Sequence, residues 1–218
     1  MKDLLLITPP FTQLNTPYPA TAYLKGFLNT KNISSYQIDL GIEVILEIFS
    51  KKGVTEIFNV KPKNLSENAQ RIFALKEEYI KTIDEVIAFL QNKKPTLARQ
   101  ICSMNFLPEA SRFNQLDDME YAFGNMGLQD KAKHLATLYL EDLSDYIVEN
   151  IDENFGFSRY AERLGRSANS FDELYEKLLS DKTFVDNFTL EILDKKLLET
   201  KPKLVCFSVP FPGNLYSA

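Results

Sequence analysis

The chain has 218 residues, a formal net charge of −5 and 44% hydrophobic residues, enough apolar side chain for a sizeable folded core. No block of basic residues stands out, so we expect neither nucleic acid nor a membrane as a partner. Two cysteines, Cys102 and Cys206, are too few for a disulfide scaffold, and no apolar run reaches the roughly 18 residues of a membrane-spanning helix. These features predict a soluble cytoplasmic protein.

The amino-terminal part has the pattern of strands alternating with helices. Residues 3–8 form a continuous apolar run without alternation, which is typical of a strand covered on both faces. Helical spacing begins near Ala20, a second strand is predicted over 35–40, and a second helix over 42–49 should end near 51–53. This order predicts a parallel sheet with right-handed crossovers.

A helical pattern fills most of the chain after this start. Apolar residues recurring from Ile72 to Leu90 predict one long helix, and a second helix is expected from Leu128 to Asn150. Ser170–Glu173 has the form of a capping box that opens a shorter helix. A last helix from Phe184 should end before Pro202.

The third strand, predicted over 204–209, follows about 150 residues after the second, although a crossover needs only a dozen or so. We therefore predict an α/β fold: a partial Rossmann- or flavodoxin-like parallel sheet, with 3–8 in the middle, that carries a large all-helical insertion. The expected division is a sheet domain formed by 1–54 and 202–218, and an insertion over 55–201.

The chain stops shortly after the third predicted strand, in what resembles the first turn of a helix. Two and a half strand–helix units make a small sheet with an exposed edge. We therefore expect this sequence to be a piece of a longer protein. The edge at 204–209 is expected to pair with another copy, so that the 218 residues self-associate.

Two of the predicted strands, 3–8 and 204–209, lead directly into prolines and aromatics. Six of the ten prolines lie in these two exits: Pro9, Pro10, Pro17, Pro19, Pro210 and Pro212. Proline ends a strand and holds the loop extended. Ligands of open α/β sheets bind where such strands end. The residues therefore predict a crevice lined by Phe11, Tyr18, Phe211 and the backbone of 208–214, suited to a flat, largely apolar ligand with amide or phosphate edges.

Other patterns favour structural roles over chemistry. The chain contains neither G-x-G-x-x-G nor a P-loop, so Asp39 is interpreted as a cap for the helix from Gly41 rather than as a ribose ligand. His134 is expected on a solvated helix surface. Three carboxylate pairs and one arginine cluster are interpreted as solvated faces: Glu77–Glu78, Asp117–Asp118, Glu141–Asp142, and Arg159, Arg163 and Arg166 with Tyr160. We predict no catalytic residue and no metal ligand in this chain.

The exits and their surroundings also resemble a known family. The segments that carry the likeness are 5–11, 17–19 with 23–26, 39–43 and 201–210. They resemble the amino-terminal cobalamin-binding domain of radical S-adenosylmethionine enzymes, over about the first 55 and the last 20 residues.

The resemblance implies a Rossmann-like module that holds cobalamin against its strand ends. It also implies a following barrel, the partner of this module, whose C-x-x-x-C-x-x-C motif carries a [4Fe-4S] cluster and which binds S-adenosylmethionine. The full enzyme would then be a methyltransferase or a radical oxidoreductase. The residues matched to the ligand-facing loops are Pro9, Pro10, Phe11, Tyr18, Pro19, Ser208, Val209, Pro210, Phe211, Pro212, Gly213 and Asn214.

The chain departs from the family pattern in two respects. It lacks the D-x-H-x-x-G motif, so no histidine ligand for cobalt is expected, and it lacks the cluster motif. The 218 residues alone are therefore expected to be non-catalytic and to hold neither iron nor cobalamin tightly. Two alternatives stay open: a non-catalytic docking module whose helical insertion binds a partner, and a nucleotide-linked transferase that uses Asp39.

Overall fold

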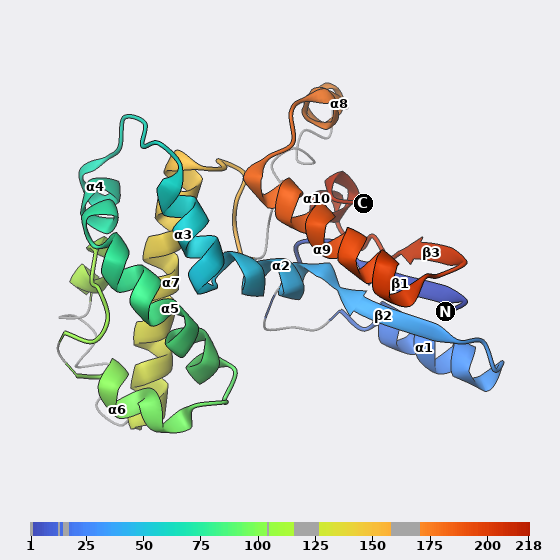
Figure 1. Ribbon diagram of the computed structural model, residues 1–218, viewed down its shortest axis with the longest axis horizontal. Helices are drawn as coiled ribbons and strands as arrows, with labels where there is room; N and C mark the ends of the chain where they lie inside the picture. The colour runs from blue at the N-terminus through green and yellow to red at the C-terminus, as the bar shows by residue number, and fades with distance from the viewer. Residues whose placement is uncertain (1, 13, 15–17, 104, 116–126, 158–170) are drawn as a thin grey trace. The chain divides into compact units, whose positions relative to one another are not determined.

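The computed structural model describes residues 2–12, 14, 18–103, 105–115, 127–157 and 171–218 (Figure 1). The chain divides into two compact units. One, called here the sheet unit, comprises residues 1–47 and 154–218, and the other, the helical unit, comprises 48–153. None of the helices in the described part of the chain is long and apolar enough to cross a membrane.

The sheet unit is built on three parallel strands in the order β2-β1-β3: β1 (Leu4–Thr8), β2 (Ser35–Asp39) and β3 (Leu204–Phe207). In the central register, Leu6 lies between Gln37 of β2 and Cys206 of β3. The predicted α/β class and the central position of the first strand are therefore confirmed.

Helices α1 (Ala20–Thr30) and α9 (Phe184–Thr200) accompany the sheet. The buried side chains Leu5, Ile7, Ile38 and Leu40 pack against three residues of α9: Ile192, Leu193 and Leu197. Figure 1 shows α9 lying along the strands. The sequence placed this helix inside the 55–201 insertion, but its apolar side chains form part of the sheet core.

Two helix boundaries in the sheet unit differ in how well the sequence predicted them. Helix α9 begins with a full capping box, in which Thr183 Oγ1 accepts from the Asp186 N–H and Asp186 Oδ2 accepts from the Thr183 N–H. The shorter helix predicted after Ser170 is α8 (Asp172–Leu179), whose first turn follows Phe171, and the capping box itself stays a prediction. Ser170 itself lies outside the described residues.

The helical unit contains α3 (Lys51–Asn59), α4 (Glu67–Ala74), α5 (Lys76–Leu90), α6 (Ala98–Ile101) and α7 (Leu128–Asn150), with short 3-10 helices η1 (Pro95–Leu97) and η2 (Ser111–Gln115). Helix α7 has the predicted bounds. The single long helix predicted through Ile72 is wrong, because the chain breaks at Leu75 between α4 and α5.

The predicted helix end at 51–53 is also wrong. Helix α2 (Leu40–Ile48) ends earlier, and residues 51–53 begin α3 instead. Ser50 is the cap, since its Oγ accepts a hydrogen bond from the Gly53 N–H at 3.0 Å. A serine hydroxyl satisfies one of the free N–H groups at a helix start, which is the reason the chain resumes helix there.

Buried tyrosines hold the helical unit together. Tyr79 of α5 and Tyr139 of α7 have ring centroids 5.0 Å apart, and Tyr146 lies 5.1 Å from Phe58 of α3. The Tyr139 hydroxyl donates to the carbonyl oxygen of Tyr79 at 3.0 Å. These contacts join three helices, because the aromatic rings bury apolar surface between them and the buried Tyr139 hydroxyl makes a hydrogen bond.

Asp142 of α7 is completely buried, so the interpretation of Glu141–Asp142 as a solvated face is wrong for this residue. Its carboxylate accepts hydrogen bonds from the backbone N–H groups of Ala110 and Arg112 at 3.0 and 3.1 Å. The Arg112 guanidinium makes two 2.7 Å hydrogen bonds to Asp145, one turn further along α7. Burial raises the pKa of Asp142 to about 6, although the two N–H donors oppose the rise.

The remaining predicted surface groups have mixed outcomes. Glu77 and Glu78 are exposed as expected, whereas His134 is half-buried on α7 rather than solvated. The pair Asp117–Asp118 and the arginine cluster over 159–166 lie outside the described residues.

Asp142 makes the stability of the chain depend on pH. Its pKa is about 6 when folded against an ordinary value of 3.8. The folded state therefore binds the proton more tightly, and this group's contribution to the unfolding free energy falls by about 3 kcal/mol as pH rises from about 4 to about 7. An Asp142→Asn variant lacks this dependence, because its amide does not titrate in that range.

Urea unfolding at several pH values, followed by circular dichroism, tests this expectation. Near pH 4, Asp142→Asn should have a lower unfolding free energy than the wild type, since an amide can accept only one of the two N–H bonds. The difference in unfolding free energy between the two proteins should become smaller toward pH 7. Glu77→Gln, which removes an exposed carboxylate of α5, is the control for the loss of a carboxylate. A gap that stays constant for Asp142→Asn would contradict the assignment.

Candidate functional site

The two proline-rich exits start side by side at one edge of the sheet. Strands β1 and β3 are parallel neighbours, so their carboxyl ends meet. The N–H of Ser208, the first residue after β3, donates to the carbonyl of Ile7 at 2.8 Å. The sheet therefore delivers Pro9 and Val209 to the same edge, as the sequence predicted.

Asn214 ties the two exits together. It lies in the short helix α10 (Pro212–Tyr216), is 0% exposed, and its Nδ2 donates to the carbonyl oxygen of Pro9 at 2.8 Å. Its Oδ1 is also buried and has no hydrogen-bond partner among the described residues. Because this acceptor is closed off from the surface, a ligand N–H could reach it only if the two exits separate.

Two aromatic side chains make a second contact between the exits. Tyr18 and Phe211 meet edge to face, with ring centroids 6.3 Å apart and planes at 62°. Tyr18 is half-buried, whereas Phe211 is 54% exposed and neighbouring Val209 is 42% exposed. Apolar surface of this kind suits a flat apolar ligand.

Phe11 lies in the interior, although the sequence predicted it as part of the crevice lining. It is only 3% exposed and meets Phe155 edge to face at 6.1 Å. Pro9 and Pro10 are buried as well. The first exit therefore enters the core, and a ligand role of these three residues stays a prediction.

Gly41 allows Phe11 to pack this closely. A Cβ at position 41 would lie 3.3 Å from Phe11 Cδ1 and 3.2 Å from Asp39 Oδ1, closer than ordinary contacts. Asp39 Oδ1 accepts a hydrogen bond from the Ile42 N–H at 3.2 Å at the start of α2. The capping interpretation of Asp39 is therefore confirmed. Burial raises the pKa of this carboxyl, and hydrogen bonds from the N–H groups of Ile42 and Gly41 oppose the rise.

The other predicted site residues differ in burial. Ser208 and Pro210 are half-buried, Gly213 is buried, and Pro19 is exposed. Pro212 is the first residue of α10. Sequence reasoning missed Phe155, the packing partner of Phe11, because no local pattern connects residues 144 positions apart.

Metal-binding groups are not gathered in the parts of the chain that the structure describes, where no cluster of three or more His, Cys, Asp or Glu could hold an ion. Cys206 lies on β3, and Cys102 belongs to the helical unit. Both are free thiols and half-buried. These residues therefore provide no ligand set for a cluster.

Comparison of the chain with protein-family models, with curated proteins and with solved structures gave no match.

Substitutions at two glycines should change the unfolding free energy in opposite directions. Gly41→Val places methyl groups against Phe11 and Asp39, and overpacking of this kind lowers the unfolding free energy by about 1–3 kcal/mol. Gly26→Ala on α1 meets nothing within 4 Å and should raise it by about 0.5–1 kcal/mol, because alanine has the higher helix propensity. Thermal unfolding of both variants checks the pair, and a neutral Gly41→Val would show that Phe11 is free to move.

Asn214→Ala should weaken the contact between the two exits. The Pro9 carbonyl loses its donor, so we expect a loss of about 1–2 kcal/mol in unfolding free energy. Leu215→Ala is the matched control, since Leu215 is the next residue of α10 and is 54% exposed; its effect should stay within about 0.5 kcal/mol. Urea denaturation measures the unfolding free energy of both variants. Equal losses would contradict a stabilising role of the hydrogen bond between Asn214 and Pro9.

Proposed function

We propose that the sheet unit is the cobalamin-binding-like module of a radical S-adenosylmethionine enzyme. The observation that carries this proposal is the meeting of the two exits, through Asn214 with Pro9 and through Tyr18 with Phe211. A parallel sheet of order 2-1-3 places such loops where ligands of open α/β sheets bind. The resemblance of both exits to this family supplies the identity of the ligand.

The residues present suit cobalamin in two respects. The corrin rim bears amide groups, and the unpaired Oδ1 of Asn214 would accept an amide N–H if the two exits separate on binding, since this atom is buried in the free chain. The exposed side chains of Phe211 and Val209 offer apolar surface to a flat ring. When bound, the cofactor would supply the methyl-transfer or radical chemistry, and these residues would hold and orient it.

The catalytic part of the proposed enzyme lies outside the described residues. In the proposed enzyme, the [4Fe-4S] cluster and S-adenosylmethionine would belong to the barrel that the family resemblance implies. The 218 residues alone are proposed to be non-catalytic and cytoplasmic.

The free edge of β3 is the proposed contact with further strands. Leu204 is 57% and Phe207 39% exposed, and β3 pairs only with β1 among the described strands. Unpaired strand edges recruit other strands. In the isolated 218-residue chain, that partner would be a second copy.

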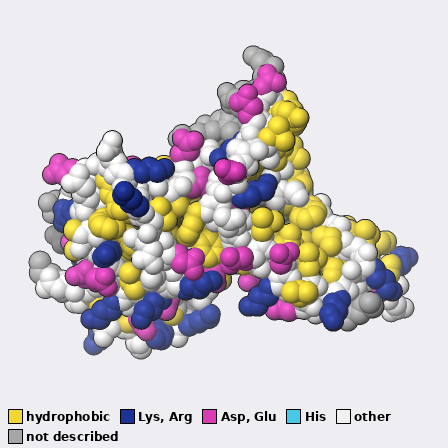
Figure 2. Space-filling model, turned by 45° about the horizontal axis from the view of Figure 1, so that its top comes forward, with side chains coloured by type: hydrophobic (Ala, Val, Ile, Leu, Met, Phe, Trp, Pro, Cys, Tyr) yellow, Lys and Arg dark blue, Asp and Glu magenta, His cyan; other side chains and the backbone are white. Residues whose placement is uncertain are grey.

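The docking alternative has less support. Within the described part of the helical unit, Leu128 is the one large hydrophobic side chain that is exposed. Exposed large hydrophobic side chains are instead numerous on the sheet unit, among them Phe171, directly before α8, and Leu179 at its end. Figure 2 shows apolar side chains over the face of the molecule in view. A partner-binding helical unit would need a wider apolar surface than this.

Hydroxocobalamin binding to the full-length protein tests the proposal. We expect a shift of the visible spectrum and a calorimetric binding signal, with Tyr18→Ala and Asn214→Ala each weakening the affinity about tenfold. Tyr175→Ala, which removes an exposed tyrosine of α8, is the control and should bind normally. Absence of binding in a full-length protein whose circular dichroism shows the native fold would overturn the proposal.

A further inference from the structure

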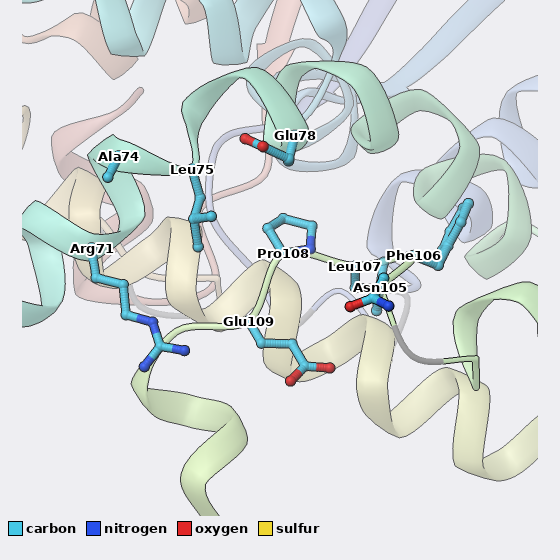
Figure 3. Close-up of a pocket in the computed structure, with 9 residues that line it drawn as sticks. All are labelled: Arg71, Ala74, Leu75, Glu78, Asn105, Phe106, Leu107, Pro108 and Glu109. Atoms are coloured by element: carbon cyan, nitrogen blue, oxygen red, sulfur yellow. The ribbon is translucent and has the colours of Figure 1, made fainter.

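A pocket of about 560 Å³ lies entirely within the helical unit, so it is independent of the proposed function (Figure 3). It is formed where α4 meets α5 and by the loop that leads toward η2. Its lining residues are Arg71, Ala74, Leu75, Glu78, Asn105, Phe106, Leu107, Pro108 and Glu109. The volume is in the usual range for small-molecule sites.

The loop wall of this pocket is held in place from behind. Asp142, completely buried, accepts the N–H of Ala110, the residue directly after the lining segment. The next N–H, from Ser111, donates to Asn68 Oδ1 of α4 at 3.0 Å. A wall fixed by buried hydrogen bonds on two helices is preformed, which lowers the entropic cost of binding a ligand.

The middle of the pocket is apolar. Leu107 and Pro108 are buried, and Leu75 and Phe106 are half-buried. Figure 3 shows Leu75 and Pro108 between Glu78 on one side and Arg71 and Glu109 on the other. An apolar side chain could therefore lie between charged groups.

The charged side chains at the rim of the pocket have no ionic partner among the described residues. Arg71, Glu78 and Glu109 are exposed, and none has a side-chain hydrogen bond or ion pair with a described residue. Arg112, in contrast, is engaged by two hydrogen bonds to Asp145. A carboxylate, Glu78, thus stands on one side of the apolar floor, and Arg71 stands with a second carboxylate, Glu109, on the other.

We propose that this pocket binds a short zwitterionic peptide with apolar side chains. The peptide carboxylate would pair with the Arg71 guanidinium, and its terminal ammonium would pair with Glu78 across the floor. An apolar side chain would contact Leu75 and Leu107. A ligand with only a negative charge would be repelled by the two carboxylates, and a ligand with only a positive charge would be repelled by Arg71. A ligand that carries both charges therefore complements the pocket.

Calorimetry and two-dimensional NMR with three small probes test the proposal on the 218-residue chain. Leu-Leu carries both charges, N-acetyl-leucine only the negative one, and leucinamide only the positive one. We expect Leu-Leu to bind with a Kd of about 1 mM or tighter and each single-charge probe to bind about tenfold more weakly. NMR shifts should centre on the backbone amides of residues 105–107 and 109.

Variants that remove one charge distinguish recognition by the charged side chains from nonspecific hydrophobic binding. Arg71→Gln and Glu78→Gln should each weaken Leu-Leu binding about tenfold. Glu77→Gln removes the neighbouring exposed carboxylate of α5, which is outside the lining, and should leave binding unchanged. The proposal is overturned if Leu-Leu fails to bind the folded chain, if the three probes bind equally, or if Glu77→Gln weakens binding as much as Glu78→Gln.

Discussion

The pairing of β1 with β2 on one side and β3 on the other is the constraint on which the sheet unit depends. It closes a chain segment of about 160 residues between β2 and β3, and the entropic cost of such closure grows only slowly with length. Burial of Leu5, Ile7 and Ile38 beneath α9 provides the offsetting hydrophobic free energy. The same pairing places both proline-rich exits at one edge, so the candidate site is a direct consequence of the sheet.

Sequence patterns predicted the elements whose signals are local. Continuous apolar runs that lead into prolines predicted β1 and β3, the handedness of crossovers predicted the strand order, and Asp39 was correctly interpreted as a cap. The break at Leu75 was missed because no glycine or proline marks it, and the burial of Asp142 was missed because its partners lie about 30 residues away. Both features depend on tertiary contacts, which helical periodicity does not encode.

The candidate site shows the same limit. In sequence, Phe11 and Tyr18 are equivalent aromatics beside prolines, yet Phe11 is buried against Phe155 whereas Tyr18 meets Phe211 near the surface. The role of Asn214 was predictable only as membership of a loop; its hydrogen bond to Pro9 exists because two distant exits converge. Residue type and spacing thus located the edge of the sheet, and packing decided which side chains stay accessible there.

Hydrogen exchange followed by mass spectrometry, with and without hydroxocobalamin, tests most directly whether the converged exits bind the ligand. In the full-length protein, the account predicts slower exchange in peptides covering residues 9–12 and 208–216, with α5 and α7 unchanged. Protection confined to the helical unit, or none at either exit under conditions where the cofactor is bound, would contradict it.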